Sequence, residues 1–176
     1  MDVESDDDRL MNRVRDGDRT AFNRLYAVLS GGLFSFLRNR GVAHDDAADV
    51  LQNVFLRVWH SRHQFTGRGA RPWVYTIARN CWLDASSAAT RRAAHPETTQ
   101  PPADSSGEDN YIARETAHVL QAALAQLPEQ TSDVVLMSRF SSMNTQEIAE
   151  VLGISDGNVK VRLHRGLQAL KEALHE

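Results

Sequence analysis

One stretch of the chain, residues 94–110 (AHPETTQPPADSSGEDN), cannot bury enough apolar surface to fold on its own. It is rich in proline, serine, threonine and acidic residues and almost lacks large apolar side chains. Segments of this composition connect folded units and do not form them. We therefore expect a flexible acidic linker over 93–112. It would join an N-terminal domain, residues 1–92, to a C-terminal domain, residues 113–176, and both are small.

Both parts of the chain space their apolar residues three and four positions apart, as amphipathic helices do. Before the linker, this spacing predicts helices that begin near Asp18, near His44 and at Arg71-Pro72, where proline is tolerated in the first turn. We expect the Gly31-Gly32 pair to kink or break the first of them. After the linker, the spacing predicts four helices. Strand signals are nearly absent, so the predicted fold class is all-α, with two small helical domains.

Composition excludes several classes of protein. The 176 residues are 41% hydrophobic and 24% charged, which allows a packed core and argues against global disorder. Uncharged stretches are too short for a membrane-spanning helix, and the acidic start, MDVESDDD, does not resemble a secretory signal. The single cysteine, Cys81, excludes an internal disulfide and a multi-cysteine zinc site. We therefore expect a soluble, cytoplasmic protein without membrane insertion.

The net charge of −3 is unevenly distributed along the chain. Residues 57–92 contain seven arginines and one acidic residue, and residues 157–176 contain four lysines or arginines and two glutamates. The stretch between these two segments is acidic. Two basic segments with an acidic spacer indicate two places of contact with a polyanion.

The strongest local motif is residues 145–165, TQEIAEVLGISDGNVKVRLHR, which has the pattern of a helix-turn-helix. A short helix, a turn at Gly153 and a second helix begun by Ser155 or Asp156 predict that the C-terminal domain is a helix-turn-helix four-helix domain. Small Ala149 stands where the two helices cross most closely. The outer face of the second helix can reach phosphates and base edges in a major groove with Asn158, Lys160, Val161, Arg162, His164 and Arg165. An ordinary helical hairpin with a solvated basic face is the alternative.

A second group of residues, in 62–79, interleaves aromatic rings with arginines around a loop that contains Gly67 and Gly69. Rings can stack on unpaired bases while guanidinium groups follow the nucleic-acid backbone, and glycine permits close approach. The candidate residues are Arg62, Phe65, Arg68, Arg71, Trp73, Tyr75 and Arg79. Aromatic residues at this density are also common in protein cores. We therefore expect Trp82 and at least one of Phe65, Trp73 and Tyr75 to be buried.

Three motifs in order resemble those of bacterial RNA polymerase sigma factors of the extracytoplasmic-function (ECF) group: ADVLQNVFLRVW, RPWVYTIARNCWLD and LPEQ…EIAEVLGISDGNVKVRLHR. The resemblance covers about residues 10–174 apart from the linker. It implies a two-domain factor that binds core RNA polymerase and directs promoter recognition and opening. The implied partners are core polymerase and promoter DNA, as duplex and as melted single strand. An anti-sigma factor is a common partner in the family, although nothing in the sequence shows its docking site.

The resemblance also implies roles for particular residues. The loop from Arg62 to Ala70 falls where the family captures an unstacked base of the minus-ten element. On the recognition helix, Lys160, Val161, His164 and Arg165 fall at positions that face the minus-thirty-five element, with Arg162 at a phosphate. The positions that dock on core polymerase correspond to Asp49, Gln52, Asn53, Phe55 and Trp59. These residues form a stripe along one predicted helix, which by composition alone would be a solvated acidic face.

The chain departs from the family pattern at several positions. Asn53 stands where an acid is usual, and Val161 stands where a small polar residue is common. Ser141-Ser142-Met143-Asn144 replaces a turn that usually contains glycine, although Asn144 or Thr145 can still cap the next helix. The sequence ASSAATRR after Asp84 delays the basic cluster that the family commonly places there, so Arg91 and Arg92 are the expected substitutes.

Two other classes remain as alternatives. A transcriptional regulator could use the helix-turn-helix without acting as a polymerase subunit, but it would not need both the polar stripe and the arginine–aromatic loop. An enzyme is disfavoured, because His60 and His63 lack a third ligand at metal spacing and Cys81 lies on an apolar helix face. We expect no catalytic residues, metal site or cofactor. The net negative charge suggests that the basic surfaces are masked until polymerase separates the domains.

Overall fold

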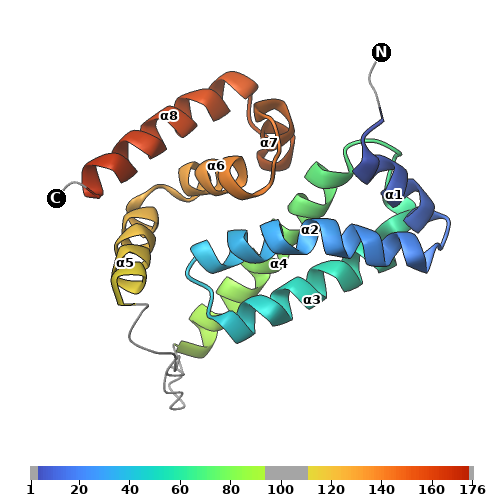
Figure 1. The fold of residues 1–176 in the computed structure, drawn as a ribbon, viewed down its shortest axis with the longest axis horizontal. Coiled ribbons are helices and arrows are strands. Elements are labelled where there is room, and N and C mark those ends of the chain that lie inside the picture. Colours follow the sequence, from blue (N-terminus) through green and yellow to red (C-terminus); the bar gives the residue numbers. More distant parts are fainter. Residues whose placement is uncertain (1–3, 94–110, 175–176) are drawn as a thin grey trace.

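The computed structural model describes the backbone of residues 4–93 and 111–174, and the side chains of residues 4–90 and 118–174 (Figure 1). No strand occurs in these ranges, which confirms the all-α prediction. The N-terminal helices are α1 (Asp6–Arg15), α2 (Arg19–Asn39), α3 (His44–Ser61) and α4 (Ala70–Ala93), with a short 3-10 turn, η1 (Arg62–Gln64), after α3. The C-terminal helices are α5 (Tyr111–Gln126), α6 (Glu129–Phe140), α7 (Thr145–Leu152) and α8 (Asp156–Ala173). Most of the predicted linker lies outside the described residues, so its bounds and those of the two domains stay predictions.

The N-terminal helices form one bundle in which α2 packs against α1 and α3, and α3 against α4. The Asp18 carboxylate begins α2 by accepting a hydrogen bond from the backbone N–H of Ala21 at 3.0 Å. This bond lowers the pKa of Asp18. The expected break at Gly31-Gly32 is wrong, because α2 runs on through both glycines. The buried side chains of Leu29 and Leu33 on either side of the pair hold the helix in the core.

Helix α1 was not expected from the sequence. Ser5 caps it, three aspartates occupy its first turn, where the helix dipole favours negative charge, and Met11 and Val14 are fully buried. The Asp8 carboxylate also accepts a hydrogen bond from the backbone N–H of Ala70 at 2.7 Å. The acidic start of the chain therefore orders the start of α4, which was predicted one residue later.

The C-terminal helices follow the predicted order. Asn144 caps α7 through a capping box with Glu147, Gly153 ends α7 with a left-handed φ of +64°, and Ser155 caps α8. Helix α8 packs so closely on α6 that a Cβ added at Gly166 would lie 2.6 Å from a methyl group of Val135. These short-range signals build the helix-turn-helix, α7–α8, that the sequence predicted.

The N-terminal and C-terminal helices also contact each other, through α2 with α6 and through α4 with α7 (Figure 1). Seven consecutive residues of α6, Thr131–Met137, are buried. An amphipathic helix of a small bundle buries one face, so burial all round requires cover from two sides. In α6, one side faces α8 and another faces the N-terminal helices. Within the described residues, we find no helix with the length and apolar character needed to cross a membrane.

Candidate nucleic-acid and polymerase interfaces

The outer face of α8 presents the six predicted DNA-contacting residues from one helix. Five of them, Asn158, Lys160, Val161, His164 and Arg165, are exposed, and Arg162 is half-buried. The Lys160 ammonium pairs with Asp156 at 2.6 Å, and Arg162 donates to the Asn158 side-chain oxygen at 2.9 Å. Both of these contacts join residues four positions apart on α8 itself. The charged groups of this face therefore point outward and are held only by their own helix.

The two helices of the helix-turn-helix are joined by buried apolar residues and by one polar contact. Ile148 and Val159 are almost fully buried between them. The Thr145 hydroxyl at the start of α7 donates to the Asp156 carboxylate at the start of α8. The hydrogen bond from Lys160, followed by that from Thr145, lowers the pKa of Asp156. The carboxylate therefore stays ionised and ties the two helix starts together.

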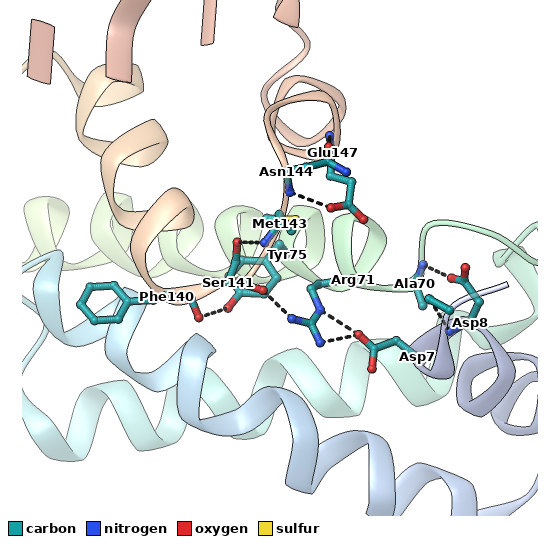
Figure 2. A network of polar contacts seen from close by, with 11 residues as sticks. Asp7, Asp8, Ala70, Arg71, Tyr75, Phe140, Ser141, Met143, Asn144 and Glu147 are labelled. Atoms are coloured by element: carbon teal, nitrogen blue, oxygen red, sulfur yellow. Dashed lines mark hydrogen bonds and ion pairs between the residues drawn. The ribbon is translucent and has the colours of Figure 1, made fainter. Parts of the chain in front are cut away.

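Two arginines of the predicted melting surface, Arg71 and Arg79 on α4, pair with other parts of the chain. Arg71 binds the Asp7 carboxylate of α1 with Nε and Nη2, at 2.7 and 2.6 Å, and donates to the carbonyl of Ser141 at 2.7 Å (Figure 2). Arg79 binds Asp133 and Glu129 of α6, at 2.9 and 3.0 Å. These carboxylate partners could not be inferred from the sequence.

Two of the three rings predicted for base stacking lie in the core. Phe65 is 3% exposed and Tyr75 is 1% exposed, which confirms that at least one ring is structural. The Tyr75 hydroxyl lies 3.5 Å from the Phe140 carbonyl, and burial raises its pKa (Figure 2). Because both rings fill the core, neither is open to a base in this conformation. Trp73 is half-buried against Phe65, and Trp82 is half-buried where full burial was expected.

The loop that precedes α4 is tied at both ends. Gly67 and Gly69 have left-handed φ values of +98° and +72°, a backbone conformation that glycine adopts without strain. Asn12 of α1 donates to the Gly67 carbonyl at 3.3 Å. Arg62 donates to the carbonyl of Trp59 and lies over its ring, 4.3 Å from the centroid. Arg68 is exposed, so the loop presents a basic residue to solvent.

The predicted polymerase-docking stripe on α3 is partly polar and partly apolar. Asp49, Gln52 and Asn53 are exposed, Trp59 is half-buried and Phe55 is buried. Asp49, Gln52 and Phe55 also line a shallow hollow, together with apolar residues that include two large exposed side chains. These two are Tyr26, at 43%, and Leu56, at 50%. Sequence reasoning did not identify either residue as part of the docking surface, although Leu56 interrupts the polar side of α3.

The remaining chemically reactive residues do not form a site. Cys81 is buried, and burial raises the pKa of its thiol, so it is a core residue as predicted. His60 and His63 are exposed, and a ring nitrogen of His60 lies 2.7 Å from the Leu56 carbonyl of its own helix. Among the described side chains, no group of three or more histidine, cysteine or acidic residues could hold a metal ion.

Comparison with protein families matches both parts of the chain. The model for Sigma-70 region 2 matches residues 25–92, and the model for Sigma-70, region 4 matches residues 117–170. RNA polymerase sigma factor CarQ of Myxococcus xanthus is 34% identical over 173 residues, which cover 94% of this chain and 96% of CarQ. ECF RNA polymerase sigma factor SigL of Mycobacterium tuberculosis is 35% identical over 133 residues, which cover 74% of this chain and 75% of SigL.

The fold has a counterpart among solved structures. The structure of CnrH in complex with the cytosolic domain of CnrY aligns with a TM-score of 0.77 and 24% identity, over 96% of this chain and 97% of that one. Helical folds of this kind with both regions belong to sigma factors, the specificity subunits of transcription initiation, which are not themselves enzymes. The chain belongs to the ECF RNA polymerase sigma factors. It binds core polymerase and directs promoter recognition and opening, and the region 2 match disfavours a regulator that carries only a helix-turn-helix.

Proposed function

We propose that the chain divides promoter recognition between two surfaces and docks on polymerase with a third. The outer face of α8 reads the minus-thirty-five element as duplex. The start of α4 and the loop 62–70 bind the minus-ten element as its strands separate. The stripe on α3 contacts core polymerase. The observation that carries this proposal is that all six predicted α8 residues lie on one helix, with five exposed, above a helix-turn-helix scaffold.

The α8 face has the chemistry that a major groove requires. Arg165, Lys160 and His164 supply donors for phosphates or for the acceptors of guanine. Val161 is 47% exposed and could contact the methyl group of thymine. The contacts of Lys160 and Arg162 within α8 are exposed pairs of modest strength, so DNA can replace them at small cost.

The α4 face contacts single-stranded DNA in two stages. Exposed Arg68, half-buried Trp73 and Arg62 form the accessible part of this face. Extrusion of a base from the duplex costs a few kcal/mol, which stacking and phosphate contacts offset. Arg71 and Arg79 join these contacts after they leave the carboxylates of α1 and α6. The buried rings of Phe65 and Tyr75 support the wall of this surface from below.

The α3 stripe provides a small amphipathic docking site. Exposed Tyr26 and Leu56 flank a hollow whose polar side carries Asp49 and Gln52. Aromatic and apolar anchors surrounded by polar groups are typical of the centre of a protein–protein interface. We propose that this site, together with Asn53 and Trp59, binds core RNA polymerase.

The remaining parts of the proposal concern the setting of the protein. It acts in the cytoplasm, where transcription takes place in bacteria. An anti-sigma factor regulates it. CnrH, which shares this fold, was solved in complex with the cytosolic domain of CnrY. The domain limits of 1–92 and 113–176 belong to this proposal as well.

Transcription in vitro with purified core polymerase on a pool of promoter fragments tests the proposal. The double variant Asp49→Arg with Gln52→Ala should abolish initiation, because a reversed charge and a lost amide disrupt the α3 stripe. Asp16→Arg is the control, since it reverses an exposed charge after the end of α1, outside the stripe. Unchanged initiation by the double variant would refute the docking assignment.

A further inference from the structure

The carboxylate of Asp133 on α6 has no exposed surface and lies between two arginines of the N-terminal helices. Arg40, after the end of α2, and Arg79, on α4, both donate to it. Neighbouring Glu129 accepts from Arg79 at 3.0 Å. We call Asp133 and Glu129 the α6 carboxylates. A wholly buried carboxylate in one half of the molecule is therefore neutralised only by the other half.

Arg40 depends on the same contact. Its side chain is 8% exposed and lies over the ring of Trp82, 4.3 Å from the centroid. Burial lowers the pKa of Arg40 to about 10, which shows that its charge has lost much of its hydration. It also donates to the backbone carbonyl of Glu129 at 3.2 Å. A buried cation is stable only with a partner of opposite charge, and α6 supplies that partner.

The two halves also approach each other closely at Gly32. A Cβ built on Gly32 would overlap the carbonyl oxygen of Phe140, at the end of α6, and would lie 2.8 Å from the Tyr75 hydroxyl. A Cβ on neighbouring Gly31 would meet no atom within 4 Å. Arg71 adds a hydrogen bond to Ser141, the residue after Phe140 (Figure 2). We call this packing of the C-terminal helices on the N-terminal helices the closed arrangement. It depends on one glycine and a small set of charged contacts.

We propose that α6 is an internal competitor of nucleic acid: its carboxylates occupy Arg79 in the closed chain, with Arg40 as a second partner of Asp133, and phosphates of the melted strand bind Arg79 in their place when the halves separate. The inference rests on the proposed role of the α4 face in binding the minus-ten strand. Both the carboxylate and the phosphate are anions that accept hydrogen bonds from the same guanidinium group, so they cannot occupy Arg79 together. Opening and single-strand binding are consequently coupled, and each favours the other.

The competitor acts on one DNA-binding surface and leaves the other free. Five of the six α8 residues that are predicted to read duplex DNA stay exposed in the closed chain, and the sixth, Arg162, is half-buried. The masking expected from the net charge therefore applies to the α4 arginines and not to the recognition helix. A closed chain can read duplex DNA, whereas capture of a single strand requires α6 to leave.

Two variants of the full chain open the closed arrangement by different means. Gly32→Ala inserts a methyl group between α2 and the Phe140 carbonyl, and alanine at this position is a better helix former than glycine. Asp133→Asn keeps the shape of the side chain and removes the charge that Arg40 and Arg79 share. Gly31→Ala is the matched control, because it makes the same change one residue away without a new contact.

The experiment measures the radius of gyration by small-angle X-ray scattering and the affinity for an oligothymidine of about 20 nucleotides. Gly32→Ala and Asp133→Asn should expand the chain and raise this affinity about tenfold, while Gly31→Ala stays compact with unchanged affinity. Circular dichroism checks that each variant keeps its helices. A chain that stays compact in both test variants overturns the proposal.

Expansion without tighter binding also overturns the proposal, and transcription by Arg79→Ala then shows which part has failed. Normal initiation by Arg79→Ala would mean that the α4 face lacks its proposed role. Reduced initiation would leave that role in place and reject only the competition by α6.

Discussion

The outer face of α8 and the exposed side of α4 carry the same kinds of residue in different states. On α8, Lys160 and Arg162 are paired with residues one turn away on the same helix. On α4, Arg71 and Arg79 are paired with carboxylates from α1 and α6, which lie far from them in sequence. Both surfaces are basic and both are predicted to bind DNA, but only α8 presents its charges ready for a ligand.

The number of basic residues on a surface therefore does not measure how readily that surface binds DNA. Exposed pairs within a helix contribute about 0.3–0.5 kcal/mol, so a phosphate displaces them easily. Breaking a buried pair by removal of one partner costs about 3–5 kcal/mol. Duplex recognition by α8 should therefore come first. Strand capture by α4 follows once polymerase has separated the halves.

Asp133→Lys should have the largest effect on the difference between the two surfaces, because it should separate the α4 arginines from α6. A lysine at 133 would place a third cation against Arg40 and Arg79, which destabilises the closed arrangement by about 3–5 kcal/mol. The halves should separate, limited proteolysis between them should accelerate, and binding of duplex promoter by α8 should change less than about twofold. A protease-resistant chain would show that α6 is not held by these charges.

Arg165→Ala should weaken the α8 side alone. Loss of an exposed arginine that contacts a base edge should cost about 1–3 kcal/mol of duplex affinity, measured by gel shift with the promoter selected in transcription. Lys171→Ala, on the last turn of the same helix, is the control and should have a smaller effect. Pull-down of core polymerase should be unchanged. Simultaneous loss of DNA and polymerase binding would indicate misfolding and contradict the assignment.

Asn144→Ala tests how firmly the scaffold holds α8. The Asn144 side chain accepts from the Glu147 N–H at 2.9 Å, and the Glu147 carboxylate accepts from the Asn144 N–H at 2.8 Å. Removal of this capping box should cost about 1 kcal/mol of stability, seen as a lower Tm. Gln146→Ala, exposed on the same turn, should leave Tm nearly unchanged. Equal Tm values for both variants would mean that the cap does not stabilise the fold.

Acidification should weaken the contact between Thr145 of α7 and Asp156 of α8. The pKa of Asp156 is lowered from 3.8, so its stabilising contribution is complete above pH 3.8 and is lost as pH falls through the lowered pKa. Denaturant midpoints measured at decreasing pH should therefore fall less steeply for Asp156→Asn than for the unmodified chain. Parallel curves would show that this carboxylate does not link the two helices.

Much of the C-terminal part of the fold could be predicted, because its signals are local. Asn144, Gly153 and Ser155 are caps and turn residues whose roles depend on near neighbours, and the structure places each as expected. The exposed α8 side chains follow from helical periodicity alone. One exception is Ser142, which adopts a left-handed φ of +58° within the turn that usually contains glycine in the family.

The contacts between distant segments could not be predicted. Helix α1 is short and acidic, and its Asp7 and Asp8 hold it in place by binding residues of α4, more than sixty positions later in the sequence. Asp133 stands within a buried run of α6, which is a detectable anomaly, but its arginine partners lie 93 and 54 positions earlier. The Gly31-Gly32 pair indicates a kink or break in the helix when read from the sequence, whereas in the structure Gly32 permits close approach of α6. Each of these features depends on which segments meet in space.

The difference between the two surfaces is tested most directly by the reaction of individual arginines with phenylglyoxal. Mass spectrometry follows this reaction residue by residue. In the free chain, Arg165 should react rapidly, while Arg40 and Arg79 should be protected by α6. Gly32→Ala should accelerate the reaction of Arg79 and leave that of Arg165 unchanged. Equal reactivity of Arg79 and Arg165 in the unmodified chain would contradict the account.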